Sequence, residues 1–146
     1  MSAASEAPHG YRLDRWTRRL DGDDTLFERA ADTVRTWGIQ RGAGLIVETV
    51  GPPTVGVDVA MAAPLPIGYI DVVCRVVAVI DEPDCYSFTY GTLPVHPEQG
   101  EESFTVSRGD DGTVTFDIVA VARPRHLLAR VAPSVARRLQ STATDR

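Results

Sequence analysis

The residues best suited to chemistry in this sequence are gathered in one short stretch, Tyr90 to Glu102, which reads YGTLPVHPEQGEE. The stretch holds a phenol, the imidazole of His96 and the carboxylates of Glu98, Glu101 and Glu102. Histidine titrates near neutral pH, and a nearby carboxylate favours its charged form. His96 and Glu98 can therefore act as a general acid and base, and Tyr90 is a third group that can move a proton. We take Tyr90, His96 and Glu98 as the catalytic candidates.

A structural role for the same stretch is the competing interpretation. His96 lies between Pro94 and Pro97, which break regular backbone, so its imidazole can instead hold a turn by hydrogen-bonding loop groups. Glu101 and Glu102 occupy adjacent strand positions and point to opposite faces, so at most one of them enters a cavity directly. The other can be solvated or can pair with an arginine. The sequence leaves these roles open.

Aromatic side chains alternate with polar ones in the strand that leads into this stretch. Tyr86, Phe88 and Tyr90 should project from one face of residues 85–90, and we expect that face to look inward. Such a surface either fills a closed core or lines a ligand cavity. The ligand-binding candidates are the side chains that we expect on or near it: Trp37, Tyr69, Arg75, Tyr86, Phe88, Thr92, Glu101, Glu102, Phe104 and Phe116.

Arg75 needs a partner if its face of the strand is buried. It stands in the β-branched run 67–80, where it shares a face with Val73, Val77 and Val79. A buried arginine must be paired, and Glu101 or Glu102 in the motif is our candidate partner. An arginine on the solvated convex face is the equal alternative.

An amphipathic helix and several strands must position these groups. In residues 21–40, Thr25 and Glu28 have the spacing of a capping box, and Gly38 fits the position after the helix end. The apolar stripe of this helix comprises Leu26, Phe27, Ala30, Ala31, Val34 and Trp37. Strands are expected over residues 10–20, 43–50, 55–62, 67–80, 85–90, 103–107 and 113–121.

A second helix is expected at the end of the chain. It begins at Arg123-Pro124, since proline suits the first helical turn, and Pro133 should kink or split it. Its apolar stripe comprises Leu127, Leu128, Val131, Val135 and Leu139. The expected order is thus one strand, one helix, six strands and one helix.

Composition excludes several function classes. A chain of 146 residues fits one domain, and its net charge of −5 with scattered arginines argues against nucleic-acid binding. No apolar run has the length of a membrane span and no signal-peptide core is present, so we expect a cytoplasmic protein. All 15 basic residues are arginine, which excludes Schiff-base chemistry. Cys74 and Cys85 should be reduced thiols, and with three dispersed histidines they form no zinc pattern, so we expect no metal and no cofactor.

The motif, with CRVVAVIDEP before it and FDIVAVARP after it, resembles an uncharacterised bacterial and plant family with a Tyr-Gly-Thr-Leu-Pro, His-Pro-Glu, Gly-Glu-Glu signature. The resemblance covers roughly residues 10–140. That family is similar to the helix-grip (START-like, SRPBCC-like) superfamily. The resemblance implies an α+β fold in which a curved antiparallel sheet wraps around a long C-terminal helix. We therefore expect one helix-grip domain over residues 9–140, between tails at 1–8 and 141–146.

The expected function is the binding of a hydrophobic, partly oxygenated small molecule between the sheet and the C-terminal helix. In one class the protein is a cofactor-independent cyclase or isomerase of specialised metabolism. It would fold a polyketide-like chain for a reaction such as spiroacetal formation, which needs mainly orientation and one acid-base group. In the other class the protein is a non-catalytic carrier or sensor of a lipid-like ligand. A homodimer is left open by the sequence.

Overall fold

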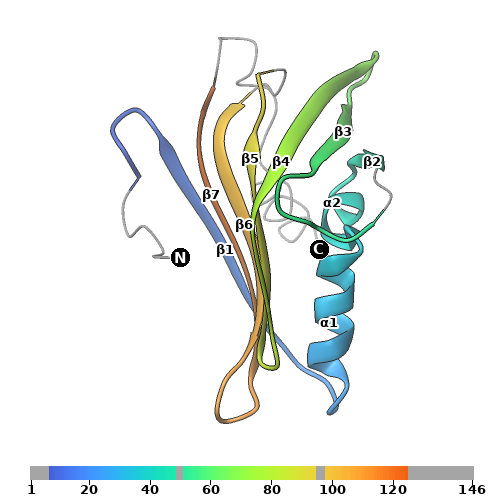
Figure 1. The fold of residues 1–146 in the computed structure, drawn as a ribbon, viewed down its shortest axis with the longest axis vertical. Coiled ribbons are helices and arrows are strands. Elements are labelled where there is room, and N and C mark those ends of the chain that lie inside the picture. Colours follow the sequence, from blue (N-terminus) through green and yellow to red (C-terminus); the bar gives the residue numbers. More distant parts are fainter. Residues whose placement is uncertain (1–6, 49–50, 95–97, 125–146) are drawn as a thin grey trace.

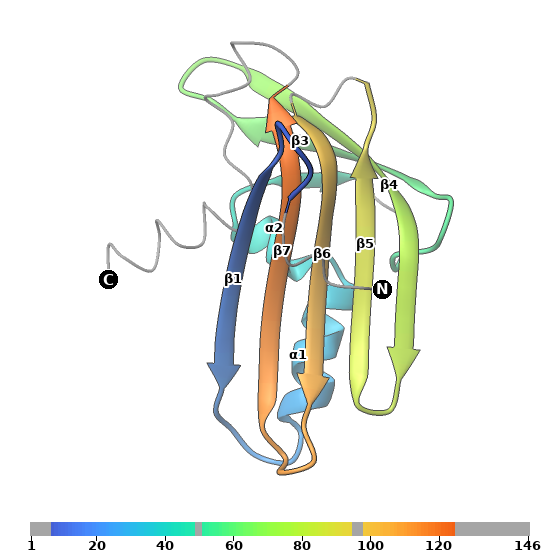
Figure 2. The ribbon, with the colours of Figure 1, turned by 90° about the vertical axis from the view of Figure 1, so that its left-hand side faces the viewer.

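The structure is a computed structural model that describes residues 7–48, 51–94 and 98–124. One seven-stranded antiparallel sheet has the strand order β1-β7-β6-β5-β4-β3-β2, and two helices lie against one of its faces (Figure 1). Figure 2 shows the strands side by side with α1 behind them. The elements are β1 (Arg12–Leu20), α1 (Leu26–Arg35), α2 (Gly38–Gly42), β2 (Ile46–Glu48), β3 (Asp58–Pro64), β4 (Tyr69–Glu82), β5 (Cys85–Thr92), β6 (Glu98–Arg108) and β7 (Val114–Pro124).

The large curved antiparallel sheet with few helices confirms the α+β architecture expected from the sequence. The inward face, by which we mean the face toward α1 and α2, carries alternate residues of each strand, as the period of two requires. Phe88, Phe104 and Ile118 on this face pack with Val34 and Trp37 in the core. The predicted start of the C-terminal helix at Arg123-Pro124 is wrong, because both residues belong to β7, and the rest of that helix lies outside the described residues. No helix in the described ranges has the length and apolar character needed to cross a bilayer.

The helical region differs from the prediction at both of its ends. Thr25 makes no side-chain cap, because its hydroxyl donates instead to Asp23, so the capping box is wrong. The helix also ends earlier than expected, and Trp37 rather than Gly38 adopts the left-handed conformation, with φ of 63°. Gly38 starts a second short helix, where a Cβ would lie 2.9 Å from the Thr33 carbonyl oxygen. Glycine is needed there for close approach rather than for a positive φ.

A β-bulge in β4 changes which of its residues share a face. The register with β5 shifts between Val76 and Ala78. As a result Val79 pairs with Phe88 and packs against the core, whereas Val77 is 44% exposed. Val79 therefore does not share the face of Arg75 and Val77 as predicted, because one extra residue reverses the alternation after the bulge.

Much of the Tyr90–Glu102 stretch is strand rather than turn. β5 continues to Thr92 and β6 begins at Glu98, five residues before the predicted start at Ser103. Gly100 makes the early start possible, since a Cβ on it would collide with the Val121 carbonyl oxygen of β7. The close contact between the β6 and β7 backbones brings Glu102 opposite Tyr90 and Ala120.

Candidate functional site

A recess of about 350 Å³ lies between α1 and the inward face of β1, β7 and β6. Trp16 and Phe116 form part of its wall, with their rings 5.5 Å apart in an edge-to-face arrangement. The polar members of the lining are exposed, which places them at the rim. The lining comprises Trp16, Arg18, Leu20, Leu26, Arg29, Ala30, Thr33, Val34, Ile39, Val106 and Phe116.

A second feature of the inward face is a group of four neighbouring side chains, which we call the polar cluster: Gln40, Cys74 and Tyr90, which are buried, and Glu102, which is half-buried. Tyr90 of β5 and Glu102 of β6 are paired in register, and Cys74 of β4 approaches the same place. α2 supplies Gln40, which is fully buried. Three neighbouring strands and one short helix therefore converge on this point.

Burial controls the protonation of two members of the polar cluster, Tyr90 and Cys74. Burial raises the pKa of the Tyr90 hydroxyl well above its ordinary value, and Glu102 and Cys74 raise it further, while the Gln40 amide opposes the shift. The pKa of the Cys74 thiol is also raised, first by burial and then by Glu102. Both groups therefore stay protonated at neutral pH. Tyr90 can donate a hydrogen bond or a proton, but it is a poor base.

The Gln40 amide is the most unusual member of the polar cluster. Its side chain is 0% exposed, yet neither Oε1 nor Nε2 makes a hydrogen bond of acceptable geometry. The amide does act on the Tyr90 hydroxyl, so the two groups are neighbours. Sequence reasoning missed Gln40 because glutamine is usually exposed. One signal was present: Gln40 lies three residues beyond Trp37, on the continuation of the apolar stripe.

The aromatic candidates fill a core more than they line a cavity. Trp37 lies 4.9 Å from Phe88, and Phe88 lies 5.1 Å from Phe104, measured between ring centroids. Tyr86 is buried at one end of this group, where the Arg35 guanidinium lies 4.4 Å from its ring centroid. Of the aromatic candidates only Phe116 lines the recess.

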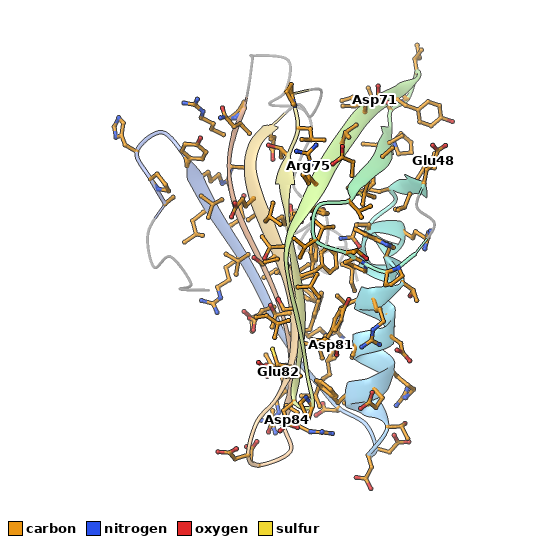
Figure 3. All side chains as sticks on the ribbon, in the orientation of Figure 1. Glu48, Asp71, Arg75, Asp81, Glu82 and Asp84 are labelled. Atoms are coloured by element: carbon orange, nitrogen blue, oxygen red, sulfur yellow. The ribbon has the colours of Figure 1, made fainter. Side chains whose placement is uncertain are left out.

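Tyr69 is not where the sequence predicted it, and for Arg75 the structure supports the alternative of a solvated face rather than a buried pair with a motif glutamate. Tyr69 is 65% exposed at the start of β4, so it does not belong to the inward aromatic surface. Arg75 lies on the outward face, apart from α1 and α2 (Figure 3), and pairs with Asp58 rather than with the motif glutamates. Its Nε and Nη2 donate to the two carboxylate oxygens at 2.6 and 3.2 Å. The reason is register, because Asp58 of β3 is the direct partner of Arg75.

The remaining motif residues divide between the two faces of β6. Glu98 is 7% exposed and Glu102 follows on the same inward face, whereas Glu101 is exposed on the other face. The Thr92 hydroxyl accepts a hydrogen bond of 2.9 Å from the Gly100 N–H, which ties β5 to β6. His96 lies outside the described residues, so its pairing with Glu98 stays a prediction.

Cysteines and carboxylates do not gather into a metal centre in the described part of the chain. Both Cys74 and Cys85 are free thiols. No group of three or more histidine, cysteine or acidic side chains suited to a metal ion occurs among the described residues.

Comparison with known proteins places this architecture in context. A family model described as "Domain of unknown function (DUF1990)" matches residues 1–146. A UPF0548 protein of Deinococcus radiodurans is 49% identical over 49 residues, which is 34% of this chain and 25% of the relative. The match thus spans about a quarter of that relative's length.

Three solved structures share the fold at low sequence identity. Hypothetical protein jhp0584 of Helicobacter pylori aligns with a TM-score of 0.59 at 11% identity, over 85% of this chain and 76% of its own. DR_A0006 of Deinococcus radiodurans gives 0.52 at 12% identity, over 90% and 93%. Ara h 8.0201 gives 0.51 at 15% identity, over 93% and 90%. These likenesses concern the fold alone.

Proposed function

This chain belongs to the DUF1990 family, and on that premise we propose that it binds a hydrophobic, partly oxygenated small molecule against the inward face of its sheet. The recess beside α1 is the observation that carries the proposal. Its volume of about 350 Å³ falls within the range of small-molecule sites. Its wall is built from apolar side chains of both layers, so an apolar ligand would be removed from water on two sides.

The polar residues of the recess are consistent with an oxygenated ligand. Arg18, Arg29 and Thr33 are exposed at the rim, so they can contact a polar end while the apolar part lies deeper. Arg29 is held by Asp23 at 3.5 Å and by the Thr25 hydroxyl at 3.0 Å. A rim of this kind orients a ligand without burying a charge.

The first test blocks the recess. Ala30→Phe should fill it and abolish saturable binding of 1-decanol, which is measured through the fluorescence of Trp16 in the recess wall. Ala60→Phe, on the exposed face of β3, is the matched control and should bind like the wild type. Undiminished binding by Ala30→Phe would remove the recess from the function. Native mass spectrometry of freshly purified protein would identify a retained metabolite.

A second candidate function is the cofactor-independent cyclase or isomerase. The observation in its favour is that Tyr90 is buried and protonated on the same face as the buried carboxyl of Glu98. In this mechanism Tyr90, His96 or Glu98 moves a proton while the inward face holds the substrate in a reactive conformer. The alternative is a carrier or sensor, in which the motif only rigidifies the sheet.

Conservative variants separate the two classes. His96→Gln and Glu98→Gln should leave the affinity for the retained metabolite nearly unchanged in both classes. Only in the catalytic class should the two variants abolish product formation, which is measured by mass spectrometry. Turnover equal to that of the wild type in both variants would exclude these two residues from any mechanism.

A further inference from the structure

The charged side chains that line the recess are all positive. Arg18 and Arg29 belong to the lining, and among the described residues no aspartate or glutamate lines it. The chain as a whole has the opposite balance, with 20 acidic and 15 basic residues and a net charge of −5. An apolar recess with a positive rim thus lies on an acidic protein. This distribution of charge attracts an anion to the recess and not to the rest of the surface.

The two arginines differ in whether the protein neutralises their charge. Arg29 already has a counterion, since its Nη2 lies 3.5 Å from Asp23 Oδ1 and its Nε donates to the Thr25 hydroxyl at 3.0 Å. In contrast, no described residue forms an ion pair or a hydrogen bond with the Arg18 guanidinium. Every other arginine in the described ranges has an acidic or hydrogen-bonding partner. The rim therefore carries one uncompensated positive charge.

The register of β1 directs this charge toward the recess. Arg18 is paired with Phe116 of β7, and directly paired residues of antiparallel strands lie on the same face of the sheet. Phe116 lines the recess, and so do Trp16 and Leu20, two residues before and after Arg18. Arg19, the next residue of β1, points to the outward face instead. The strand thus places one arginine at the recess and another on the opposite side.

We propose that the recess binds an amphipathic carboxylate, whose apolar chain lies between α1 and the sheet and whose carboxylate pairs with Arg18 at the rim. The planar guanidinium offers parallel N–H groups that match two carboxylate oxygens. One uncompensated charge suits a monoanion, because Asp23 would repel the second charge of a phosphate monoester. The ion pair stays at the exposed rim, so neither charge has to be fully desolvated. This inference rests on the proposed function and narrows its ligand to carboxylates.

The test compares four probes of one chain length: decanoate, 1-decanol, decyltrimethylammonium and decyl phosphate. Each is titrated below its micelle concentration into the wild type at low salt and pH 8, where a carboxyl group is ionised. The fluorescence of Trp16 in the recess wall reports binding. Decanoate should bind about fivefold tighter than 1-decanol, which is the gain expected from one exposed ion pair. The ammonium probe should bind more weakly than 1-decanol, and decyl phosphate no tighter than decanoate.

Salt and substitutions then locate the preference for decanoate. About 0.5 M NaCl should reduce it, because salt screens an exposed pair. Arg18→Met should abolish it and leave the affinity for 1-decanol unchanged, whereas Arg18→Lys should keep part of it, since the charge remains but the planar fork is lost. Arg19→Met is the matched control, because it removes the same charge from the outward face of the same strand, and it should keep the preference. If Arg18→Met does not fold, Arg18→Gln removes the charge with a polar side chain and should cause the same loss.

Other results would overturn the inference. Equal affinity for decanoate and 1-decanol, or a preference that survives Arg18→Met, would show that Arg18 only covers apolar surface with its methylene stem. An equal loss in Arg19→Met would assign the preference to net charge rather than to the recess. Tighter binding of decyl phosphate would overturn the choice of a carboxylate. In each of these cases, saturable binding that Ala30→Phe abolishes would leave the recess function standing. If no probe changes the fluorescence of Trp16 in the wild type, both proposals fail.

Discussion

Tyr90 is the residue at which the sequence motif meets the core and the polar cluster. It pairs with Glu102 across β5 and β6 and stacks on Trp37. Its hydroxyl is deeply buried, and its pKa is raised first by burial. At neutral pH the residue therefore serves as a hydrogen-bond donor. To act as a base, the Tyr90 hydroxyl would first have to ionise, and the nearby Glu102 carboxylate opposes that ionisation.

The raised pKa of Tyr90 predicts a loss of stability in alkaline solution. Above its ordinary pKa of 10.0 the tyrosine ionises in the unfolded chain but not in the folded protein. The unfolded state then binds fewer protons, so the free energy of unfolding falls as the pH rises above about 10. Tyr90→Phe should make this decline shallower, measured by urea unfolding at pH 8 and pH 10.5. An identical decline in both proteins would contradict the assignment.

The Arg75–Asp58 pair should contribute little to stability. Both side chains are about half exposed, at 52% and 48%, and exposed ion pairs are weak because water screens them. Arg75→Ala should therefore leave the urea midpoint unchanged within error. A large destabilisation would instead favour a buried partner for Arg75. Arg108→Ala, which removes the exposed pair with Asp84, is a useful comparison.

At the scale of elements, the two motif glycines, Gly91 in β5 and Gly100 in β6, differ in whether a Cβ would fit at their positions. A Cβ on Gly100 would collide with the β7 backbone at Val121, and Gly100 has φ of 155°. A Cβ on Gly91 would make ordinary contacts, the nearest at 3.8 Å to Val77. The motif thus contains one glycine required by close packing of strands and one that is not.

This difference gives a matched pair of variants. Gly100→Ala should lower the free energy of unfolding by roughly 3 kcal/mol or more, because two backbones must separate. Gly91→Ala should change it by less than about 1 kcal/mol. Chemical denaturation of both variants measures the difference. Similar values for the two would show that β6 and β7 can move apart at Gly100 with little cost.

The break between α1 and α2 is the other element that shapes the site. Without it, the stripe that ends at Trp37 would continue as one helix. With Trp37 in the left-handed conformation, α2 turns and places Gln40 against Tyr90. The polar cluster therefore depends on a helix junction as much as on the sheet.

At the scale of the whole molecule, one face of a long sheet carries two kinds of environment. The middle of the inward face is filled by Trp37, Phe88 and Phe104, whereas the recess lies beside α1 and the polar cluster behind α2. A ligand in the recess would contact both the helical layer and the sheet. Such a ligand would stabilise the contact between these layers.

Binding should therefore stabilise the entire fold. At a 1-decanol concentration 100 times its Kd, mass action adds about 2.7 kcal/mol to the free energy of unfolding. For a domain of this size the melting temperature should rise by roughly 5–10 °C. Thermal denaturation followed by circular dichroism measures the shift, and Ala30→Phe should show none. A shift of equal size in Ala30→Phe would place the binding elsewhere on the molecule.

The sequence alone determined the strand content, the amphipathic helix and the inward direction of Tyr86, Phe88 and Tyr90. These features follow from local periodicity, because side chains alternate between the two faces of a strand and return to the same face of a helix about every 3.6 residues. The flanks of the motif alternate and were predicted as strands, but β5 and β6 extend further into the motif than predicted. The resemblance to a helix-grip fold came from the motif, and it agrees with the architecture of the described residues.

Only the tertiary structure decided which side chains meet. The pairing of Arg75 with Asp58, the reversal at the β4 bulge and the exposure of Tyr69 depend on register between strands. The burial of Gln40 depends on a helix junction packed against a distant strand. Such contacts join residues far apart in the chain, so no local pattern encodes them. For that reason the sequence predicted the aromatic strand, and it missed the buried Gln40 amide beside Tyr90.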